Sequence, residues 1–278
     1  MSINKINGAV SDTLSKVNGT RNTLLSNMLV PSSSICGSCS PEIANAPMFN
    51  SHSIDLDGSA DYIDLDAVVG DIDTDAGAVT LWFKINAGAA TSQLWKTNQS
   101  SSAAQNQIQI YYNSPNDKIV FQQKYNGEAV TWNSTAITPG DDNWHFIAMS
   151  WSDLDFIAYL NTEASGVQTL NQLNTPTPFN PGKCMAGRNS AASNLYLDGH
   201  LDEIGMWDAE LSAAALVAIY NNGKGINLSR DVNDYTNASD LIGYWKMEEN
   251  TGNTVVDSSG GGETGALNAT DLWSTDTI

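Results

Sequence analysis

The sequence predicts an all-β protein of the β-sandwich, jelly-roll type, and two observations carry this prediction. From about residue 54 onward, short runs of alternating apolar and polar residues follow one another, separated by Gly, Asn, Asp and Pro. Alternation with period two is the pattern of a half-buried strand, and such punctuation is typical of turns. Only one convincing helix interrupts the runs, beginning after the N-cap residue Ser212 and ending at Asn222-Gly223. Many short strands without interleaved helices indicate a sandwich or jelly roll.

The expected strands can be placed one after another along the chain. The connections Asn-Ser-Pro-Asn-Asp and Tyr-Asn-Gly-Glu contain turn-forming residues, so the strands beside them form a meander. We expect strands over residues 54–58, 62–65, 78–85, 107–112, 118–124, 129–132, 144–151 and 156–161.

Residues 1–45 differ from the rest, and we expect an N-terminal extended arm and linker there, followed by the sandwich over 46–278. The arm has no aromatic residue, and it leaves through a stretch rich in Pro and Ser. Within it Ile3-Asn-Lys-Ile-Asn-Gly8 recurs approximately as Leu14-Ser-Lys-Val-Asn-Gly19. Two copies are too few for a solenoid, so the arm either orders against another subunit or is a disordered tail.

The chain is strongly acidic, and this limits its partners. It has 31 Asp and Glu against 12 Lys and Arg, a formal net charge of −19. Such a charge repels phosphate backbones and anionic lipids, and we therefore expect neither a nucleic-acid nor a membrane partner. Carboxylates that converge on a loop would instead favour a hard divalent cation such as calcium.

The three cysteines do not form a disulfide framework, which is denser in cysteine. Cys36 and Cys39 form a lone CxxC without the further ligands of a zinc site. Its Pro- and Ser-rich flanks favour a loop with two thiols or one small local bridge.

Three segments in order resemble the laminin-G-like family of concanavalin-type lectin domains. Leu56-Asp-Gly-Ser-Ala-Asp-Tyr-Ile-Asp-Leu65 is similar to the family's opening DGxxDYV strand and turn. Residues 143–151 and 158–161 resemble two following strands, although Thr162 stands where the family usually has Gly. Leu197-Asp-Gly-His-Leu-Asp-Glu-Ile-Gly-Met-Trp and the helix after it resemble the closing strand and helix. The resemblance covers about residues 48–225 and implies a laminin-G-like sandwich.

A fourth segment indicates a permuted strand order. Residues 241–260, which begin Leu-Ile-Gly-Tyr-Trp-Lys-Met-Glu-Glu, resemble the family's usual first strand, yet they lie near the C-terminus. We therefore expect residues 240–278 to complete the same sandwich. This order, together with the Asn-Lys-Ile-Asn-Gly arm, resembles virion structural proteins of tailed phages.

A calcium site is the leading local hypothesis. In the family's fold the loop after the first strand lies beside the closing strand, so Asp57, Asp61 and Asp202 are candidate calcium ligands. The alternatives are a plain Asp-Gly turn for Asp57 and rim hydrogen bonding for Asp202.

Aromatic residues of the middle meander are candidates for a sugar-stacking platform, with cross-strand packing as the alternative. These candidate ligand-binding residues are Trp95, Tyr111, Tyr112, Tyr125 and Trp132.

Catalysis is not expected. Glucanases of this fold place two carboxylates on one cleft, but the chain has no ExDxE-like run. Asp153 and Asp155 have the right period, yet they lie at a predicted turn without a Glu partner. The three histidines lie apart from any Ser or Cys motif that would make a triad.

Two functions follow as hypotheses. The first is a non-enzymatic virion structural protein, a decoration, tail or fibre component. Its residues 1–45 would bind other virion proteins, its sandwich would adhere to host polysaccharide, and the protein would form a homo-oligomer. The alternative is a free, secreted, calcium-dependent carbohydrate-binding module.

Overall fold

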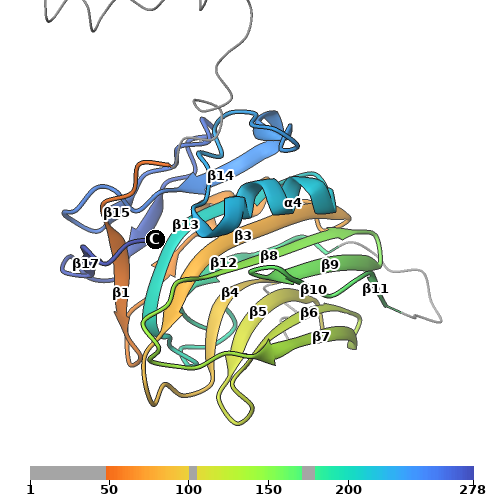
Figure 1. Cartoon of the computed structure of the whole chain (residues 1–278). Helices are drawn as coiled ribbons and strands as arrows, with labels where there is room; N and C mark the ends of the chain where they lie inside the picture. The colour runs from red at the N-terminus through yellow and green to blue at the C-terminus, as the bar shows by residue number, and fades with distance from the viewer. Residues whose placement is uncertain (1–47, 100–104, 171–178) are drawn as a thin grey trace, which may run out of the picture. The chain divides into compact units, whose positions relative to one another are not determined.

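The computed structural model describes residues 48–99, 105–170 and 179–278, which lie within one compact unit of the chain, Ala46–Ile278. The predicted arm, with Cys36 and Cys39, lies outside the described residues. Two antiparallel sheets form the two layers of a β-sandwich, and among the described residues there is one α-helix (Figure 1). The predicted sandwich fold is confirmed. None of the described helices is long and apolar enough to cross a membrane.

The described strands form a nine-stranded sheet, sheet A, and an eight-stranded sheet, sheet B. Sheet A runs β10-β9-β8-β3-β13-β1-β17, with β11 paired to β9 and β14 paired to β13. Its strands are β1 (Ser53–Asp57), β3 (Ala76–Ile85), β8 (His145–Ser152), β9 (Asp155–Leu160), β10 (Glu163–Ala164), β11 (Gln168–Thr169), β13 (Asp198–Trp207), β14 (Leu241–Trp245) and β17 (Trp273–Ser274). Sheet B runs β15-β16-β2-β12-β4-β5-β6-β7. Its strands are β2 (Ile63–Asp64), β4 (Ser92–Asn98), β5 (Gln107–Asn113), β6 (Lys118–Tyr125), β7 (Glu128–Ala136), β12 (Lys183–Ala186), β15 (Thr254–Val255) and β16 (Gly265–Leu267).

The helix α4 (Ala213–Tyr220) has the ends that its sequence predicts. The Ser212 hydroxyl accepts a hydrogen bond from the Ala215 N–H at 3.1 Å, which satisfies one of the free donors of the first turn. Asn221 adopts the left-handed conformation and ends the helix. Three short 3-10 segments, η2 (Asp66–Gly70), η3 (Asn221–Gly223) and η4 (Ala238–Asp240), lie in connections.

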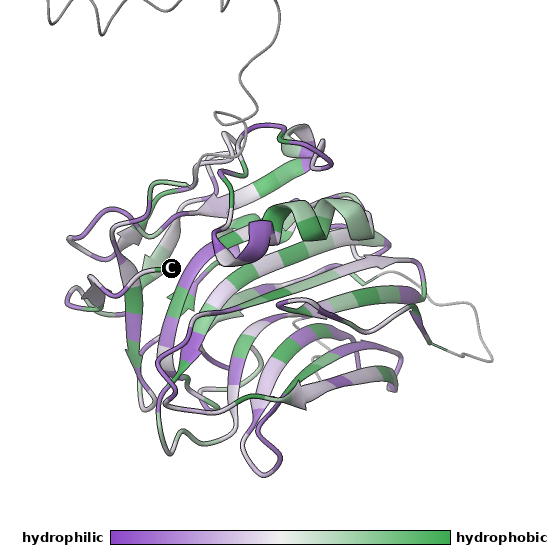
Figure 2. Cartoon of the chain, viewed as in Figure 1, coloured by the Kyte–Doolittle hydropathy of each residue, from purple (hydrophilic) through white to green (hydrophobic). Residues whose placement is uncertain are grey.

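Hydrophobic and hydrophilic residues alternate along the strands (Figure 2), and the buried apolar side chains form two cores. The larger core lies between the sheets and contains buried residues of both, including Phe83, Phe121, Trp151 and Trp245. The smaller core lies on the other face of sheet A, where α4 packs over Trp82, Phe146 and Trp207. Sheet A is therefore covered on both faces, and helix α4 lies on the side of sheet A that faces away from sheet B (Figure 1).

The segment after residue 240 contributes to both sheets. It supplies β14 and β17 to sheet A and β15 and β16 to sheet B. Its last residues are held by Lys84, a buried side chain whose Nζ lies 2.7 Å and 2.8 Å from the two carboxylate oxygens of Asp276. The Trp144 indole N–H donates to the same carboxylate at 3.1 Å. The end of the chain is thus fastened by charge-assisted hydrogen bonds.

Candidate functional site

Two of the predicted calcium ligands, Asp57 and Asp61, share one turn. The Asp57 Oδ1 accepts N–H groups of Ser59 at 2.8 Å and Ala60 at 2.9 Å, and the Ser59 hydroxyl donates to Oδ2. The Ser59 hydroxyl and these N–H groups lower the pKa of Asp57. Burial, followed by the charge on Asp57, raises the pKa of Asp61. The turn itself therefore occupies the oxygens of Asp57, as an Asx turn does.

The third predicted ligand, Asp202, lies elsewhere. Asp57 pairs with Asp198 on β13, so Asp202 is four residues further along that strand, about 13 Å away at the usual strand rise. It is fully buried on the outer face of sheet A, beside Glu203. The three predicted ligands do not form one coordination sphere. No group of three or more His, Cys, Asp or Glu side chains arranged for a metal occurs in residues 48–99, 105–170 or 179–278.

Asp202 and Glu203 form a buried pair of carboxylates at a β-bulge of β13. The Asn50 amide N–H₂ donates to Asp202 at 2.9 Å, and the Tyr244 hydroxyl donates to Glu203. Burial raises the pKa of Asp202 well above its ordinary value, and the neighbouring Glu203 adds to the shift. Burial also raises the pKa of Glu203 to about 8. Since both side chains are enclosed, neither can reach a saccharide at the surface.

Four of the five predicted stacking residues face the core. Trp95, Tyr112 and Tyr125 are 0%, 1% and 2% exposed and belong to the apolar cluster between the sheets. Trp132 packs against Phe121 with ring centroids 5.2 Å apart. A ring that is buried between two sheets offers no face to a sugar, so the predicted five-residue platform is not formed. Tyr111 is the exception, since it alternates with the inward residues Ile110 and Tyr112 and points to the outer face of sheet B.

The outer face of sheet B carries a second set of polar side chains around Tyr111. We call Lys96 of β4, Gln109 and Tyr111 of β5, and Gln122 and Lys124 of β6 the polar face of sheet B. Register pairs Lys96 with Gln109 and Gln109 with Gln122, so these three lie in one row across the strands. Sequence analysis missed four of these five residues. For Gln109, Gln122 and Lys124 the signal was the polar half of predicted alternating strands, whereas Lys96 lies in β4, which was not predicted as a strand.

Hydrogen bonds hold the amides of this face in place. The Gln109 and Gln107 side-chain amides donate to Gln122 Oε1 at 2.9 Å and 3.0 Å. The Gln122 amide in turn donates to the Thr131 hydroxyl of β7 at 3.1 Å. An ordered array of amide donors and acceptors loses little side-chain entropy when it binds hydroxyl groups, so the face is prepared for a polar ligand.

Lys96 is unusual among these side chains because it is only 5% exposed although it lies on an outer face. The loop after β12 covers it, and the ammonium donates to Asn189 Oδ1 at 3.0 Å. Burial, and next the charge on Lys124, lower the pKa of Lys96 to about 8. Within the described residues no carboxylate forms an ion pair with Lys96, Lys124 or Arg188.

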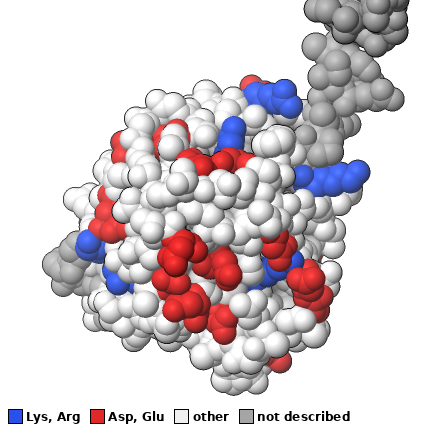
Figure 3. Space-filling model, turned by 90° about the vertical axis from the view of Figure 1, so that its left-hand side faces the viewer, with Lys and Arg blue, Asp and Glu red and all other residues white. Residues whose placement is uncertain are grey.

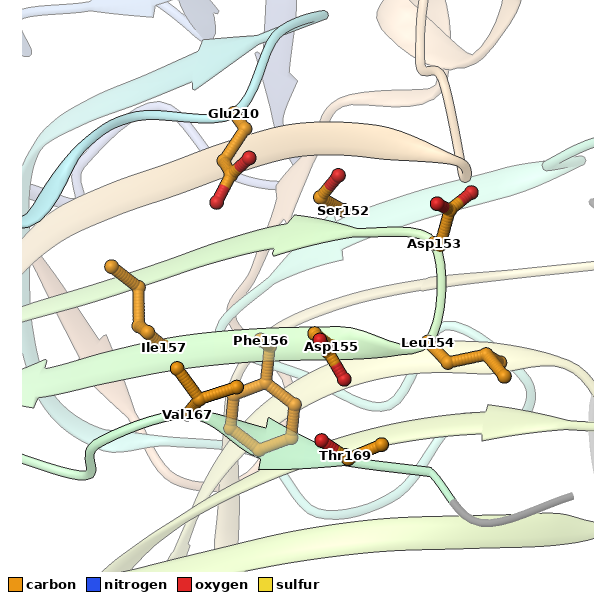
Figure 4. A pocket seen from close by; sticks show the side chains of 9 residues that line it. All are labelled: Ser152, Asp153, Leu154, Asp155, Phe156, Ile157, Val167, Thr169 and Glu210. Carbon is orange, nitrogen blue, oxygen red and sulfur yellow. The ribbon is translucent and has the colours of Figure 1, made fainter.

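A separate pocket of about 460 Å³ lies beside the turn between β8 and β9 (Figure 4). Its carboxylates are Asp153, Asp155 and Glu210, and Ile157 and Val167 supply apolar surface. The three carboxylates are all exposed, and none of them faces another closely across the pocket. A glycosidase needs a desolvated acid opposite a second carboxylate. This pocket does not have that arrangement.

Carboxylates also gather on the side of the molecule that carries β1 and β17 (Figure 3). This clustering agrees with the net charge of the chain. By contrast, β4, β5, β6 and β12 contain no Asp or Glu. In the register of sheet B, Asp64 of β2 pairs with Met185 of β12, which in turn pairs with Lys96. The polar face of sheet B is thus a cationic and amide-rich area on an acidic protein.

Within the part of the chain that the structure describes, two antiparallel layers with one short helix have the architecture of a concanavalin-type sandwich. The chain belongs to the concanavalin A-like lectin/glucanases superfamily, whose model matches residues 57–217, more than half of the sequence. No curated protein sequence matches the chain.

Solved structures share the fold at low sequence identity. A Bacteroides ovatus protein proposed to bind carbohydrate aligns at 12% identity and a TM-score of 0.56, over 82% of this chain and 61% of its own. The K499G mutant of the NanB sialidase from Streptococcus pneumoniae aligns at 15% identity and a TM-score of 0.51, over 62% of this chain. The chain spans only 28% of that sialidase. These likenesses describe the fold.

Proposed function

We propose that the chain is a non-enzymatic carbohydrate-binding protein whose sandwich holds a glycan on the polar face of sheet B. The observation that carries this proposal is the ordered row of Lys96, Gln109 and Gln122 beside the outward ring of Tyr111. Sugar hydroxyls pair well with fixed amides, and an aromatic ring packs against the apolar face of a pyranose. Within the described residues no side chain hydrogen-bonds the Tyr111 hydroxyl, which leaves it for a ligand.

Two further observations support binding without hydrolysis. The adjacent pair Asp202 and Glu203 is enclosed, and the carboxylates of the Figure 4 pocket are all solvated. The superfamily to which the chain belongs contains lectins as well as glucanases. The fold is compatible with both, so the proposal rests on the residues of the polar face.

The variant Tyr111→Ala tests this location. The full-length chain is screened on a glycan array, and the affinity for the best ligand is then measured by calorimetry. We expect Tyr111→Ala to weaken binding about tenfold or more, because an aromatic contact of this size is lost. Asp155→Asn, in the Figure 4 pocket, is the matched control and should bind normally. Loss of binding in Asp155→Asn alone would move the site to that pocket, and an array without any ligand would overturn the function.

We further propose, from the resemblance of the arm and of the permuted order, that the protein is a virion component anchored through residues 1–45. Light scattering of the full-length chain beside a chain that begins at Ala46 is the test. We expect a defined homo-oligomer that is lost with the arm. Two identical monomers would contradict arm-driven assembly and would favour the free carbohydrate-binding module, for which calcium dependence stays a prediction.

A further inference from the structure

Two of the described lysines are paired with carboxylates, and Lys96 and Lys124 are not. Lys84 and Lys183 are paired with carboxylates, the first with Asp142 and Asp276 and the second with Asp66. Lys96 and Lys124 share one face, and the charge of Lys124 acts on Lys96. The two positions are diagonal neighbours across β5, since Lys96 pairs with Gln109 and Lys124 with Gln107. Two cations thus face the same small area.

A third cation borders this area. Arg188 stacks its guanidinium on Tyr62 at 3.8 Å and contacts the sulfur of Met185, whose strand neighbour is Lys96. Its Nε is buried without a hydrogen-bond partner. Stacking fixes the plane of a guanidinium and so directs its remaining donors. Lys96 and Lys124 therefore flank the amides of Gln109 and Gln122, and Arg188 lies beside Met185, the strand neighbour of Lys96.

A buried ammonium without an anionic partner is costly. A charged group that leaves water loses several kcal/mol of solvation unless a counter-charge and hydrogen bonds replace it. Lys96 is 5% exposed and has one described hydrogen bond, to an amide oxygen. A neutral residue of similar length would fill the same space without this cost. The burial of the Lys96 ammonium is explained if a bound anion, which is not part of the described residues, supplies its counter-charge.

We propose that the ligand of the polar face of sheet B is an acidic saccharide, whose anionic group binds at the half-buried Lys124 and within the field of the buried Lys96 ammonium, while its hydroxyls bind Gln109 and Gln122. This inference rests on the proposed function and adds the substrate class. The amides supply hydrogen bonds that any saccharide can use, whereas the two ammonium groups select for charge. A neutral glycan would leave both cations unpaired, and it therefore binds more weakly.

The experiment compares each acidic polysaccharide with its own carboxyl-reduced form. Uronic-acid polymers, sialylated oligosaccharides and sulfated polymers are immobilised beside neutral counterparts, and binding of the full-length chain is followed by biolayer interferometry. We expect carboxyl reduction to weaken binding at least tenfold. Raising the salt from 50 to 500 mM should weaken the acidic ligand more than the neutral one, because salt screens the charges. Comparison of the sulfated polymers with the uronic-acid polymers shows whether sulfate or carboxylate is the anionic group that binds.

The double variant Lys96→Met, Lys124→Met provides a second test. It should lose the preference for the acidic form and fold with an unchanged or higher melting temperature, since a buried unpaired charge is removed. Lys224→Met, on the loop after α4, removes the same charge elsewhere and is the matched control. If the double variant misfolds, Lys124→Met alone, at a half-buried position, gives the test.

The outcomes separate this inference from the proposed function. Equal affinity for native and carboxyl-reduced glycans, unchanged in Lys124→Met, would overturn the acidic ligand and leave carbohydrate binding intact. Absence of binding to every glycan would overturn both. Loss of acidic preference in Lys224→Met as well would show that net charge, and not this face, sets the preference.

Discussion

The variant Gly199→Ala is expected to lose a large part of the stability of the sandwich. Gly199 lies in β13 at the centre of sheet A, where it pairs with Ile85 of β3 and Leu56 of β1. A Cβ at this position would lie 2.1 Å from the Lys84 carbonyl oxygen and 3.0 Å from its carbonyl carbon. Because both are backbone atoms of a paired strand, they cannot rotate away as a side chain can. We expect the free energy of unfolding to fall by about 4 kcal/mol or more, which is exceptional for one methyl group.

Urea denaturation followed by tryptophan fluorescence measures this loss, and Gly70→Ala is its control. Gly70 ends η2, and a Cβ at this position would meet no atom within 4 Å, so its substitution should change stability by less than about 0.5 kcal/mol. A Gly199→Ala protein as stable as wild type would mean that β3 and β13 separate more easily than their pairing indicates.

The second large effect is a dependence of stability on pH, measured with a chelator present. The pKa of Glu203 is about 8 in the folded chain against an ordinary 4.5, and that of Asp202 is also well raised. Between those two values the folded state binds more protons than the unfolded state, so the free energy of unfolding falls as the pH rises. We expect the melting temperature to drop on the order of 10 °C between pH 5 and 8.5.

Glu203→Gln should flatten this curve, because the amide needs no proton and still accepts the Tyr244 hydroxyl. Glu210→Gln, which replaces an exposed carboxylate, should keep the wild-type dependence. Melting by circular dichroism at five pH values is sufficient. A rise in melting temperature over the same window would contradict the buried pair, since that sign belongs to carboxylates whose pKa is lowered on folding.

The strands that sequence analysis found are those in which alternation is visible. Residues 78–85 and 144–151 carry apolar side chains at every second position, and β3 and β8 lie there. The strands β4 and β12 were missed because Ser-Gln-Leu-Trp-Lys-Thr-Asn and Lys-Cys-Met-Ala show no such period. All of β4 is buried, as is β12 apart from its first residue. Since β3 and β8 are also covered on both faces, burial alone does not hide a strand, and it is the lack of alternating apolar residues in β4 and β12 that concealed them.

The candidate site was predicted less well, for a reason that strand geometry explains. Aromatic residues were selected by type, but the face to which each points depends on strand register. Tyr111 and Tyr112 are adjacent in sequence and lie on opposite faces of β5. Register also separates Asp202 from Asp57, since a position along a paired strand cannot be read from a motif alone. The family resemblance supplied the fold, and the cationic face became visible only once the strands were paired.

The pairing of Ser53 with Ser274 places the beginning and the end of the sandwich side by side on β1 and β17. A short peptide that joins the two ends, with the chain reopened in the connection before β14, would give a circular permutant that starts with the strand usual for the family. The contacts of both cores would be kept, because only loops are cut and joined. Because these two ends are adjacent, the domain could also be inserted into a surface loop of a carrier protein, where it would serve as the ligand-binding part of a sensor.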